Sequence, residues 1–222
     1  MHHEHDAGVA AEGYLWLKWT CCVAMSISGP GATNVITAIG SCYVDAIPTL
    51  FLTGQVDVKL IRKHNKIRQN GFQETDIVSI VKPIIKHAKF VTEINDVLYE
   101  LEKSVFIAKH GRPGPVLLDF PYNVQSAEVE PKKLRHFLGS KEHKAYQQEL
   151  LPPEKQVAQK ISKLQQLLVE SSSPVILAGN GIRLSNTDKE LQIFAKKNNI
   201  PVVCSLMGVD SFLASDKRFV GF

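Results

Sequence analysis

Ser28-Gly29-Pro30-Gly31-Ala32-Thr33-Asn34 joins two segments of different character. Residues 21–27 before it are short, partly β-branched and uncharged, which is typical of a strand buried on both faces. Residues 32–43 after it have a helical pattern. The two glycines let the backbone of this turn approach a neighbour closely, while Pro30 stiffens it by fixing φ. The stretch predicts either a ligand-binding turn at the carboxyl end of a parallel strand or a plain strand-to-helix connection.

Strand and helix patterns alternate on both sides of this turn. Helices are expected at 6–19, 32–43, 77–81 and 95–109, and strands at 21–27, 49–53, 86–91 and 116–120. Such alternation predicts an α/β fold with a mostly parallel open sheet.

The composition changes after residue 125. Residues 127–153 are rich in Lys, Glu, His and Pro and lack a sustained period, which predicts a linker. Beyond it, helices at 154–169 and 187–198 and strands at 175–178 and 202–205 begin a second α/β unit, with too few strands for an independent sheet. We therefore expect a first domain at 1–126, a linker at 127–153 and the start of a second domain at 154–222.

Composition and charge exclude several classes of protein. The net charge of +4 over 222 residues is too mild to indicate nucleic-acid binding. No segment approaches the ~20 apolar residues of a membrane span, and no secretory signal opens the chain. Cys21, Cys22, Cys42 and Cys204 show no CxxC spacing, which favours reduced thiols in a cytoplasmic protein over disulfides or a zinc site.

A series of short motifs resembles the thiamine-diphosphate-dependent enzymes, and most closely the large catalytic subunit of acetolactate synthase or an acetolactate-synthase-like protein. The motifs, in chain order, are His3-Glu4, Ala10-Ala11-Glu12-Gly13-Tyr14, the Ser28–Asn34 turn, Thr53-Gly54-Gln55-Val56, Gly71-Phe72-Gln73-Glu74, Lys86-His87 and Gly111-Arg112-Pro113-Gly114-Pro115-Val116. The match is dense over residues 1–125 and looser over 178–182 and 200–208. It implies a pyrimidine-binding domain that lacks its first elements, followed by the start of a central domain.

The resemblance assigns a catalytic role to Glu4. In the family, a glutamate here hydrogen-bonds the pyrimidine of thiamine diphosphate and favours the tautomer that deprotonates the thiazolium carbon. A carboxyl group that shares a proton is expected to be buried, because burial raises its pKa. Since His3 and His5 flank Glu4, a metal-binding or tag-like segment is the alternative interpretation.

Further site residues follow from the same resemblance. Pro30 and Asn34 match positions that face the pyrimidine, and Gln55 matches one near the reacting carbon. Phe72 and Gln73 match the loop on which the small keto acid packs.

Lys86 matches a lysine at the substrate channel, with a solvated surface lysine as the alternative. Gly179, Gly181 and Met207 match positions where the central domain contacts FAD, although Gly-x-Gly alone is a weak signal.

The stretch between Gln55 and Phe72 departs from the biosynthetic enzyme. It is longer and more basic, and Asp57 replaces a proline that often follows Gly-Gln-Val. Its basic side chains are Lys59, Arg62, Lys63, Lys66 and Arg68. They would suit a phosphorylated acceptor such as a nucleotide-linked keto sugar, or form an ordinary solvated loop.

Two family features are missing from this sequence. The strand upstream of Glu4 is absent, and no Gly-Asp-Gly motif, which holds Mg²⁺ against the diphosphate in the family, occurs in the 222 residues. The chain is therefore expected to be part of a carboligase that decarboxylates pyruvate and adds the two-carbon unit to a second keto acid, in branched-chain amino-acid biosynthesis. It is expected to form a homo-oligomer through the first domain and to be inactive alone. A non-catalytic truncated remnant is the alternative.

Overall fold

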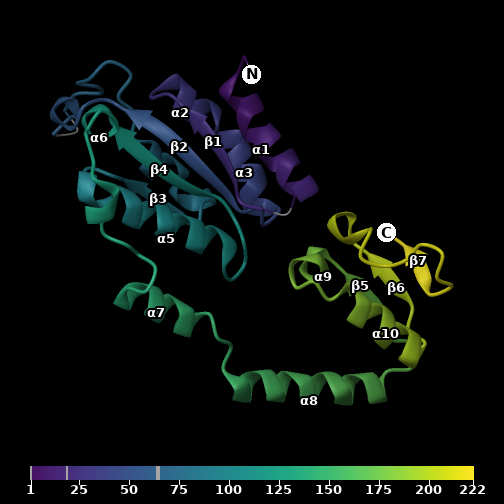
Figure 1. The fold of residues 1–222 in the computed structure, drawn as a ribbon. Helices are drawn as coiled ribbons and strands as arrows, with labels where there is room; N and C mark the ends of the chain where they lie inside the picture. The colour runs from purple at the N-terminus through teal and green to yellow at the C-terminus, as the bar shows by residue number, and fades with distance from the viewer. Residues whose placement is uncertain (1, 19, 64–65) are drawn as a thin grey trace. The chain divides into compact units, whose positions relative to one another are not determined.

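The computed structural model describes residues 2–18, 20–63 and 66–222, and it divides into two compact units, Met1–Leu151 and Pro152–Phe222 (Figure 1). The first unit contains a four-stranded sheet with helices on both faces. Its helices are α1 (Glu4–Lys18), α2 (Pro30–Asn34), α3 (Ile36–Val44), α4 (Ile77–Val81), α5 (Val97–Lys109), α6 (Tyr122–Gln125) and α7 (Lys141–Glu149). Its strands are β1 (Cys22–Ser26), β2 (Thr49–Gln55), β3 (His87–Phe90) and β4 (Val116–Pro121). Single 3₁₀ turns occur at Val58–Leu60, Lys82–Ile84, Ile94–Asp96 and Pro131–Lys133.

The sheet of the first unit is parallel throughout, in the order β1-β2-β4-β3. Ser26 pairs with Thr53, and Thr53 pairs with Asp119. The carboxyl ends of β1, β2 and β4 therefore meet at one edge, which is where open parallel sheets bind ligands. The α/β fold with a parallel sheet expected from the sequence is confirmed.

Side-chain alternation along the strands builds two cores. Ala24, Phe51 and Leu117 belong to the core that α1, α3 and α4 cover, while Leu50 and Leu118 belong to the core that α5 covers. Successive residues of a strand face opposite sides, so each strand contributes to both cores. On β1, the side chains of Val23 and Met25 are 53% and 69% exposed, so this edge of the sheet keeps an uncovered apolar face.

The Gly-Pro-Gly turn leads directly into a helix. The predicted helix at 32–43 begins two residues earlier, with Pro30 at the first turn of α2, where proline is well accommodated because no N–H is needed there. It then divides at Val35 into α2 and α3. The predicted helix at 6–19 is α1, and Trp19 lies outside the described residues.

The predicted linker at 127–153 is wrong over most of its length. Residues up to Leu151 belong to the first unit and include α7. Phe137 is fully buried, with its ring centroid 5.4 Å from that of Tyr99 and 5.7 Å from that of Phe106. The Glu102 carboxylate accepts hydrogen bonds from the backbone N–H of Phe137 and of Leu138. These contacts to α5 are long-range, so they leave no period in the local sequence.

The second unit has its own parallel sheet in the order β5-β6-β7. Its elements are α8 (Glu154–Glu170), β5 (Ile176–Ala178), α9 (Asn180–Leu184), α10 (Asp188–Asn198), β6 (Val202–Cys204), a 3₁₀ turn at Leu206–Gly208 and β7 (Phe219–Gly221). The sequence predicted two strands and missed β7, whose three residues are too few for a recognisable period. The core includes Ala195, Val202 and Cys204.

In the parts of the chain that the structure describes, no helix combines the length and apolarity that crossing a membrane would need.

Candidate functional site

A cavity of about 580 Å³ opens at the carboxyl edge of the first unit's sheet. Glu4 reaches it from the start of α1, Ser28 from the turn after β1, and Gln55 from the end of β2. Its apolar wall is formed by Met25, Ile27, Leu52 and Phe120, and polar side chains, among them Ser26, Thr53 and Gln125, also line it. Both predicted catalytic residues, Glu4 and Gln55, therefore line one cavity, and apolar walls combined with polar groups can hold and orient a flat heterocycle.

Asn34 holds the Glu4 carboxylate. Asn34 Nδ2 donates a hydrogen bond to Glu4 Oε2 over 3.0 Å, which joins the end of α2 to the start of α1. A side chain built on Gly31 would have its Cβ 3.2 Å from Glu4 Oε1 and 2.6 Å from Ile27 Cγ1. The glycine of the turn thus leaves room for Glu4, as the close-approach interpretation of the Gly-Pro-Gly sequence requires.

The electrostatics of Glu4 differ from the expectation. The hydrogen bond from Asn34 holds the pKa of Glu4 below its usual value, and the side chain is 31% exposed. The expected burial, with its raised pKa, is absent in this chain because no described residue covers the cavity side of the carboxylate. His3 Nδ1 lies 4.0 Å from Glu4 Oε2, and His5 Nδ1 lies 4.0 Å from Asp6 Oδ1. Among the described residues, no group of three His, Cys, Asp or Glu is suited to a metal ion.

Gln73 meets the turn through its backbone. Gly29 has φ of +60°, and a Cβ there would lie 2.8 Å from Gln73 Cβ and 3.0 Å from the Gln73 carbonyl oxygen. Gln73 itself has φ of 63°, an unusual conformation for a residue with a side chain. The predicted substrate loop is therefore packed on the predicted cofactor turn, with Phe72 projecting 83% exposed. Pro30 is also exposed and does not line the cavity.

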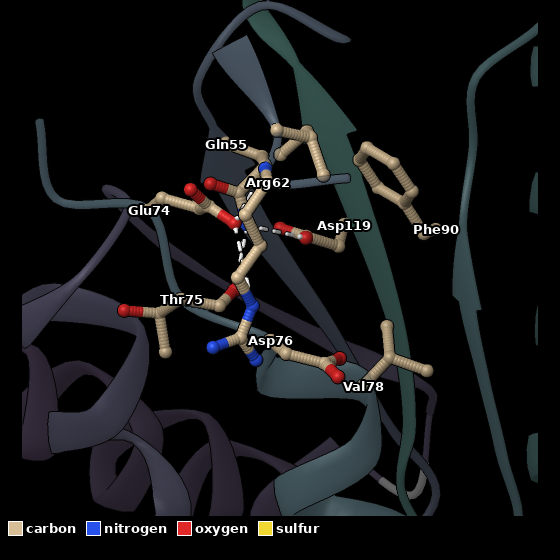
Figure 2. A pocket seen from close by; sticks show the side chains of 9 residues that line it. Gln55, Arg62, Glu74, Thr75, Asp76, Val78, Phe90 and Asp119 are labelled. Atoms are coloured by element: carbon tan, nitrogen blue, oxygen red, sulfur yellow. Dashed lines mark hydrogen bonds and ion pairs between the residues drawn. The ribbon is translucent and has the colours of Figure 1, made fainter. Parts of the chain in front are cut away.

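Gln55 is held by three hydrogen bonds. Its Nε2 donates to the Thr75 carbonyl over 2.6 Å and to Asp119 Oδ2 over 3.1 Å (Figure 2). Its Oε1 accepts from the Val56 N–H over 3.0 Å. The side chain is 7% exposed. Its amide is thus fully engaged within the protein, which favours a positioning role over direct contact with a reacting carbon.

Asp119, which the sequence did not point out, bonds Gln55 and lines a smaller cavity next to the candidate site. It is 2% exposed within β4 and accepts hydrogen bonds from Thr53 Oγ1 over 2.7 Å and from Gln55. Burial raises the pKa of Asp119 to about 6. An available signal was the aspartate itself, since a charged residue inside the otherwise apolar strand 116–120 is uncommon unless it has polar partners.

Glu74 organises the basic loop between β2 and α4. Its carboxylate accepts hydrogen bonds from the backbone N–H groups of Arg62, Asn70 and Gly71. Although burial alone would raise the pKa of Glu74, these donors hold that pKa below its usual value. The side chains of Lys59, Lys63, Lys66 and Arg68 are exposed on this loop, so they are available to solvent or to an anion.

The structure places Lys86 away from the other predicted site residues. Lys86 precedes β3 and therefore lies at the amino end of the parallel sheet, whereas Glu4 and Gln55 lie at the carboxyl end. Its Nζ donates hydrogen bonds to the carbonyls of Ile107 and His110 near the end of α5, and burial lowers the pKa of Lys86 to about 8. Lys86 lines a separate cavity of about 390 Å³. Within this unit, then, Lys86 is not brought to the predicted substrate side.

Gly179, Gly181 and Met207 all lie in the second unit. Gly179 precedes α9, and a Cβ on Gly208 would be 2.9 Å from Gly179 Cα, so these two glycines allow the turns after β5 and β6 to touch. Met207 lies in the same 3₁₀ turn as Gly208 and is half-buried. Nothing lies within 4 Å of a Cβ on Gly181, so packing within this unit does not require a glycine there.

The α/β fold agrees with the families that the sequence matches. A model described as the N-terminal TPP binding domain of thiamine pyrophosphate enzymes matches residues 1–80, and a model of their central domain matches residues 161–222. The chain belongs to the thiamine pyrophosphate (thiamine diphosphate) enzyme family.

Its similar curated relatives are acetolactate synthase large subunits. That of Buchnera aphidicola subsp. Acyrthosiphon pisum is 37% identical over 212 residues, covering 96% of this chain and 35% of the relative. That of Corynebacterium glutamicum is 35% identical over 224 residues, covering 100% of this chain and 33% of the relative. The isozyme 3 large subunit of Escherichia coli is 33% identical over 223 residues, covering 100% of this chain and 36% of the relative. The chain spans about a third of the length of these relatives.

Proposed function

We propose that this chain supplies the pyrimidine-binding part of a thiamine-diphosphate-dependent carboligase of the acetolactate synthase type. The reaction would decarboxylate pyruvate and join the two-carbon unit to a second 2-keto acid, in branched-chain amino-acid biosynthesis. The observation that carries the proposal is Glu4, held by Asn34 beside a glycine turn and facing the cavity at the carboxyl edge of the sheet. The names of the relatives support the choice of reaction.

The residues present fit the pyrimidine end of the cofactor. When bound, thiamine diphosphate supplies the carbon nucleophile and stabilises the negative charge left by decarboxylation. Glu4 would hold a proton at a ring nitrogen, Asn34 would orient Glu4, and the apolar cavity walls would exclude water from the ring. Phe72 and Gln73 would form the keto-acid side, with Gln55 placing their loop.

Glu4 needs a higher pKa for this role than it has in the isolated chain. A lowered pKa favours the charged carboxylate, whereas sharing a proton requires burial. We propose that a second subunit and the cofactor cover the cavity, which makes the active enzyme a homo-oligomer built through the Ser28–Asn34 turn. Mg²⁺ and the diphosphate would be held outside this chain, FAD would contact Gly179, Gly181 and Met207, and the assembly would be cytoplasmic.

A specific observation favours a second candidate function. The loop with Lys59, Lys63, Lys66 and Arg68 is ordered by Glu74 next to the predicted substrate residues and leaves these cations exposed. A related carboligase acting on a nucleotide-linked keto sugar would use them for the phosphates. If the chain is instead a non-catalytic remnant, neither acceptor reacts.

The test transfers the first unit into a full-length acetolactate synthase. Residues 2–151 replace the matching segment, and Glu4→Gln is compared with the parent chimaera. Glutamine keeps the shape but cannot share a proton, so hydrogen exchange at the reactive carbon of bound thiamine diphosphate should slow ~10²–10⁴-fold while cofactor affinity changes little.

The control replaces His3 and His5 with Gln, which should leave exchange intact. Equal exchange in the Glu4→Gln and parent chimaeras would remove the catalytic assignment. Product analysis with a keto acid and with a nucleotide-linked keto sugar as acceptors distinguishes the two candidate functions.

A further inference from the structure

Asp119 is a buried carboxyl group whose partners are all neutral donors. Thr53 Oγ1 and Gln55 Nε2 donate to its two oxygens, and no ion pair among the described residues includes it. The charged groups around the adjacent cavity of about 250 Å³ are Arg62, Glu74 and Asp76 (Figure 2). Because a buried charge without a cation is costly, its retention needs a reason beyond packing.

Gln55 connects Asp119 to the loop before α4 through hydrogen bonds. The two N–H groups of one amide reach Asp119 on β4 and the carbonyl of Thr75, which belongs to the loop before α4 (Figure 2). With Oε1 taken by the Val56 N–H, the amide has a single orientation that satisfies all three contacts. Asp119 is therefore one of the three groups that fix the orientation in which the Gln55 amide donates to the Thr75 carbonyl.

The loop Gly71–Asp76 in turn contacts the turn of the candidate site. Glu74 N–H donates to the Gly71 carbonyl, and the Glu74 carboxylate closes the loop on itself. Gln73, at positive φ, places its backbone against Gly29, and Phe72 projects from the same loop. A continuous set of contacts thus runs from Asp119 through Gln55 and Thr75 to Gln73 and Gly29.

We propose that Asp119 is a positioning residue that acts through Gln55 to hold the loop Gly71–Asp76 against the Ser28–Asn34 turn. That this loop orients a keto-acid substrate rests on the proposed function, whereas the mechanical link does not. A simpler role, in which Asp119 only pairs β2 with β4 through Thr53, would leave the loop independent of it.

The first experiment measures amide hydrogen exchange of Asn70 and Gly71, which donate to Glu74, in the intact 222-residue chain. Asp119→Ala removes the acceptor of Gln55 and should speed exchange roughly 5- to 30-fold. Asp119→Asn should restore slow exchange, because its oxygen can accept from Gln55 while its NH₂ donates to Thr53. If Asp119→Ala does not fold, Asp119→Leu keeps the volume without an acceptor and should also show fast exchange.

Leu118→Ala is the matched control, since Leu118 is the neighbouring buried residue of β4 and lacks polar contacts. It should lower global stability without selectively speeding loop exchange. The proposal would be overturned if Leu118→Ala speeds amide exchange in the loop as much as Asp119→Ala does. It would also be overturned if exchange in Asp119→Asn is as fast as in Asp119→Ala.

A double-mutant cycle tests whether Gln55 is the intermediary. Asp119→Ala and Gln55→Ala should each speed exchange, and the double variant should exchange about as fast as the faster single one. Multiplicative effects would show that Asp119 does not act through Gln55. Neither result depends on cofactor binding, so the proposed function can fail in the chimaera while this inference stands, and the reverse.

Discussion

At the scale of single residues, two carboxyl groups near the carboxyl edge of the sheet have their pKa values shifted in opposite directions. The Asn34 hydrogen bond lowers the pKa of Glu4, while burial raises that of Asp119 to about 6. The groups lie in different surroundings, since Glu4 faces an open cavity and Asp119 faces neutral donors inside the sheet. One carboxylate therefore lines an open cavity, and the other forms its hydrogen bonds within the sheet.

Asn34→Ala should raise the pKa of Glu4 toward its usual value, because it removes the hydrogen bond that contributes most to the shift. Carbon-detected NMR titration of the Glu4 carboxyl measures this directly. Thr33→Ala is the control, since Thr33 bonds the Pro30 carbonyl and not Glu4. An unchanged pKa in Asn34→Ala would contradict the assigned contact.

Asp119→Asn should stabilise the first unit at neutral pH and do so less in acid. The folded-state pKa of about 6 exceeds the usual 3.8, so the folded chain binds the proton more tightly than the unfolded chain. The contribution of Asp119 protonation to the free energy of unfolding is therefore fully present below about pH 4 and is lost as the pH rises through 6. At pH 7.5 the variant should gain about 1–3 kcal/mol relative to the parent.

Urea unfolding at pH 4 and pH 7.5 checks this prediction. Tryptophan fluorescence can follow the unfolding, because the sequence has two tryptophans and Trp16 lies on α1 of the first unit. If variant and parent differ in free energy of unfolding by the same amount at both pH values, burial does not raise the pKa of Asp119.

At the scale of elements, the site depends on contacts between the turn after β1 and the loop before α4. Gly29 allows this approach, because its φ of +60° and its distance to Gln73 both exclude a side chain. The elements themselves, α2 with five residues and the loop beside it, are too short to be stable alone. Their mutual contact and the strands beneath them hold the geometry.

Gly29→Ala should destabilise the first unit by about 1–3 kcal/mol through backbone strain and the clash with Gln73. Gly13→Ala is the matched control, since Gly13 is exposed within α1 with nothing within 4 Å of the added Cβ. It should stabilise by about 0.5–1 kcal/mol because alanine favours the helix. Urea unfolding measures both, and equal effects would refute a close contact between turn and loop.

At the scale of the whole molecule, the chain consists of two α/β units, and local signals predicted most of the elements of both. The Gly-Pro-Gly turn, the buried strands and the helix at 77–81 were predictable because their signals lie within a few residues. The packing of Phe137 on α5 was not, since its partners are more than 30 residues away. Glu4 and Asn34 could be predicted as site residues because each belongs to a recognisable motif of the sequence. The contact between Asp119 and Thr53 could not be predicted, because it depends on which strands pair in the sheet. Lys86 precedes its strand, which in a parallel sheet puts it at the edge opposite Glu4 and Gln55, so its role at a substrate channel stays a prediction.

The uncovered apolar face of β1 leads to a prediction about association. Val23, Met25 and Ile27 are 53%, 69% and 61% exposed beside the candidate site, and such patches favour contact with another protein surface. The chain should therefore associate with increasing concentration in sedimentation velocity, through this face and the adjoining Ser28–Asn34 turn on which the proposed homo-oligomer is built.

Met25→Lys should shift this association toward monomer, because a charge at the centre of an apolar contact is costly to bury. Leu177→Lys provides the control, since Leu177 is similarly exposed, at 73%, but belongs to the second unit. If Leu177→Lys dissociates the chain and Met25→Lys does not, the interface lies on the second unit. A single monomeric species at high concentration in the parent chain would contradict self-association through β1 altogether.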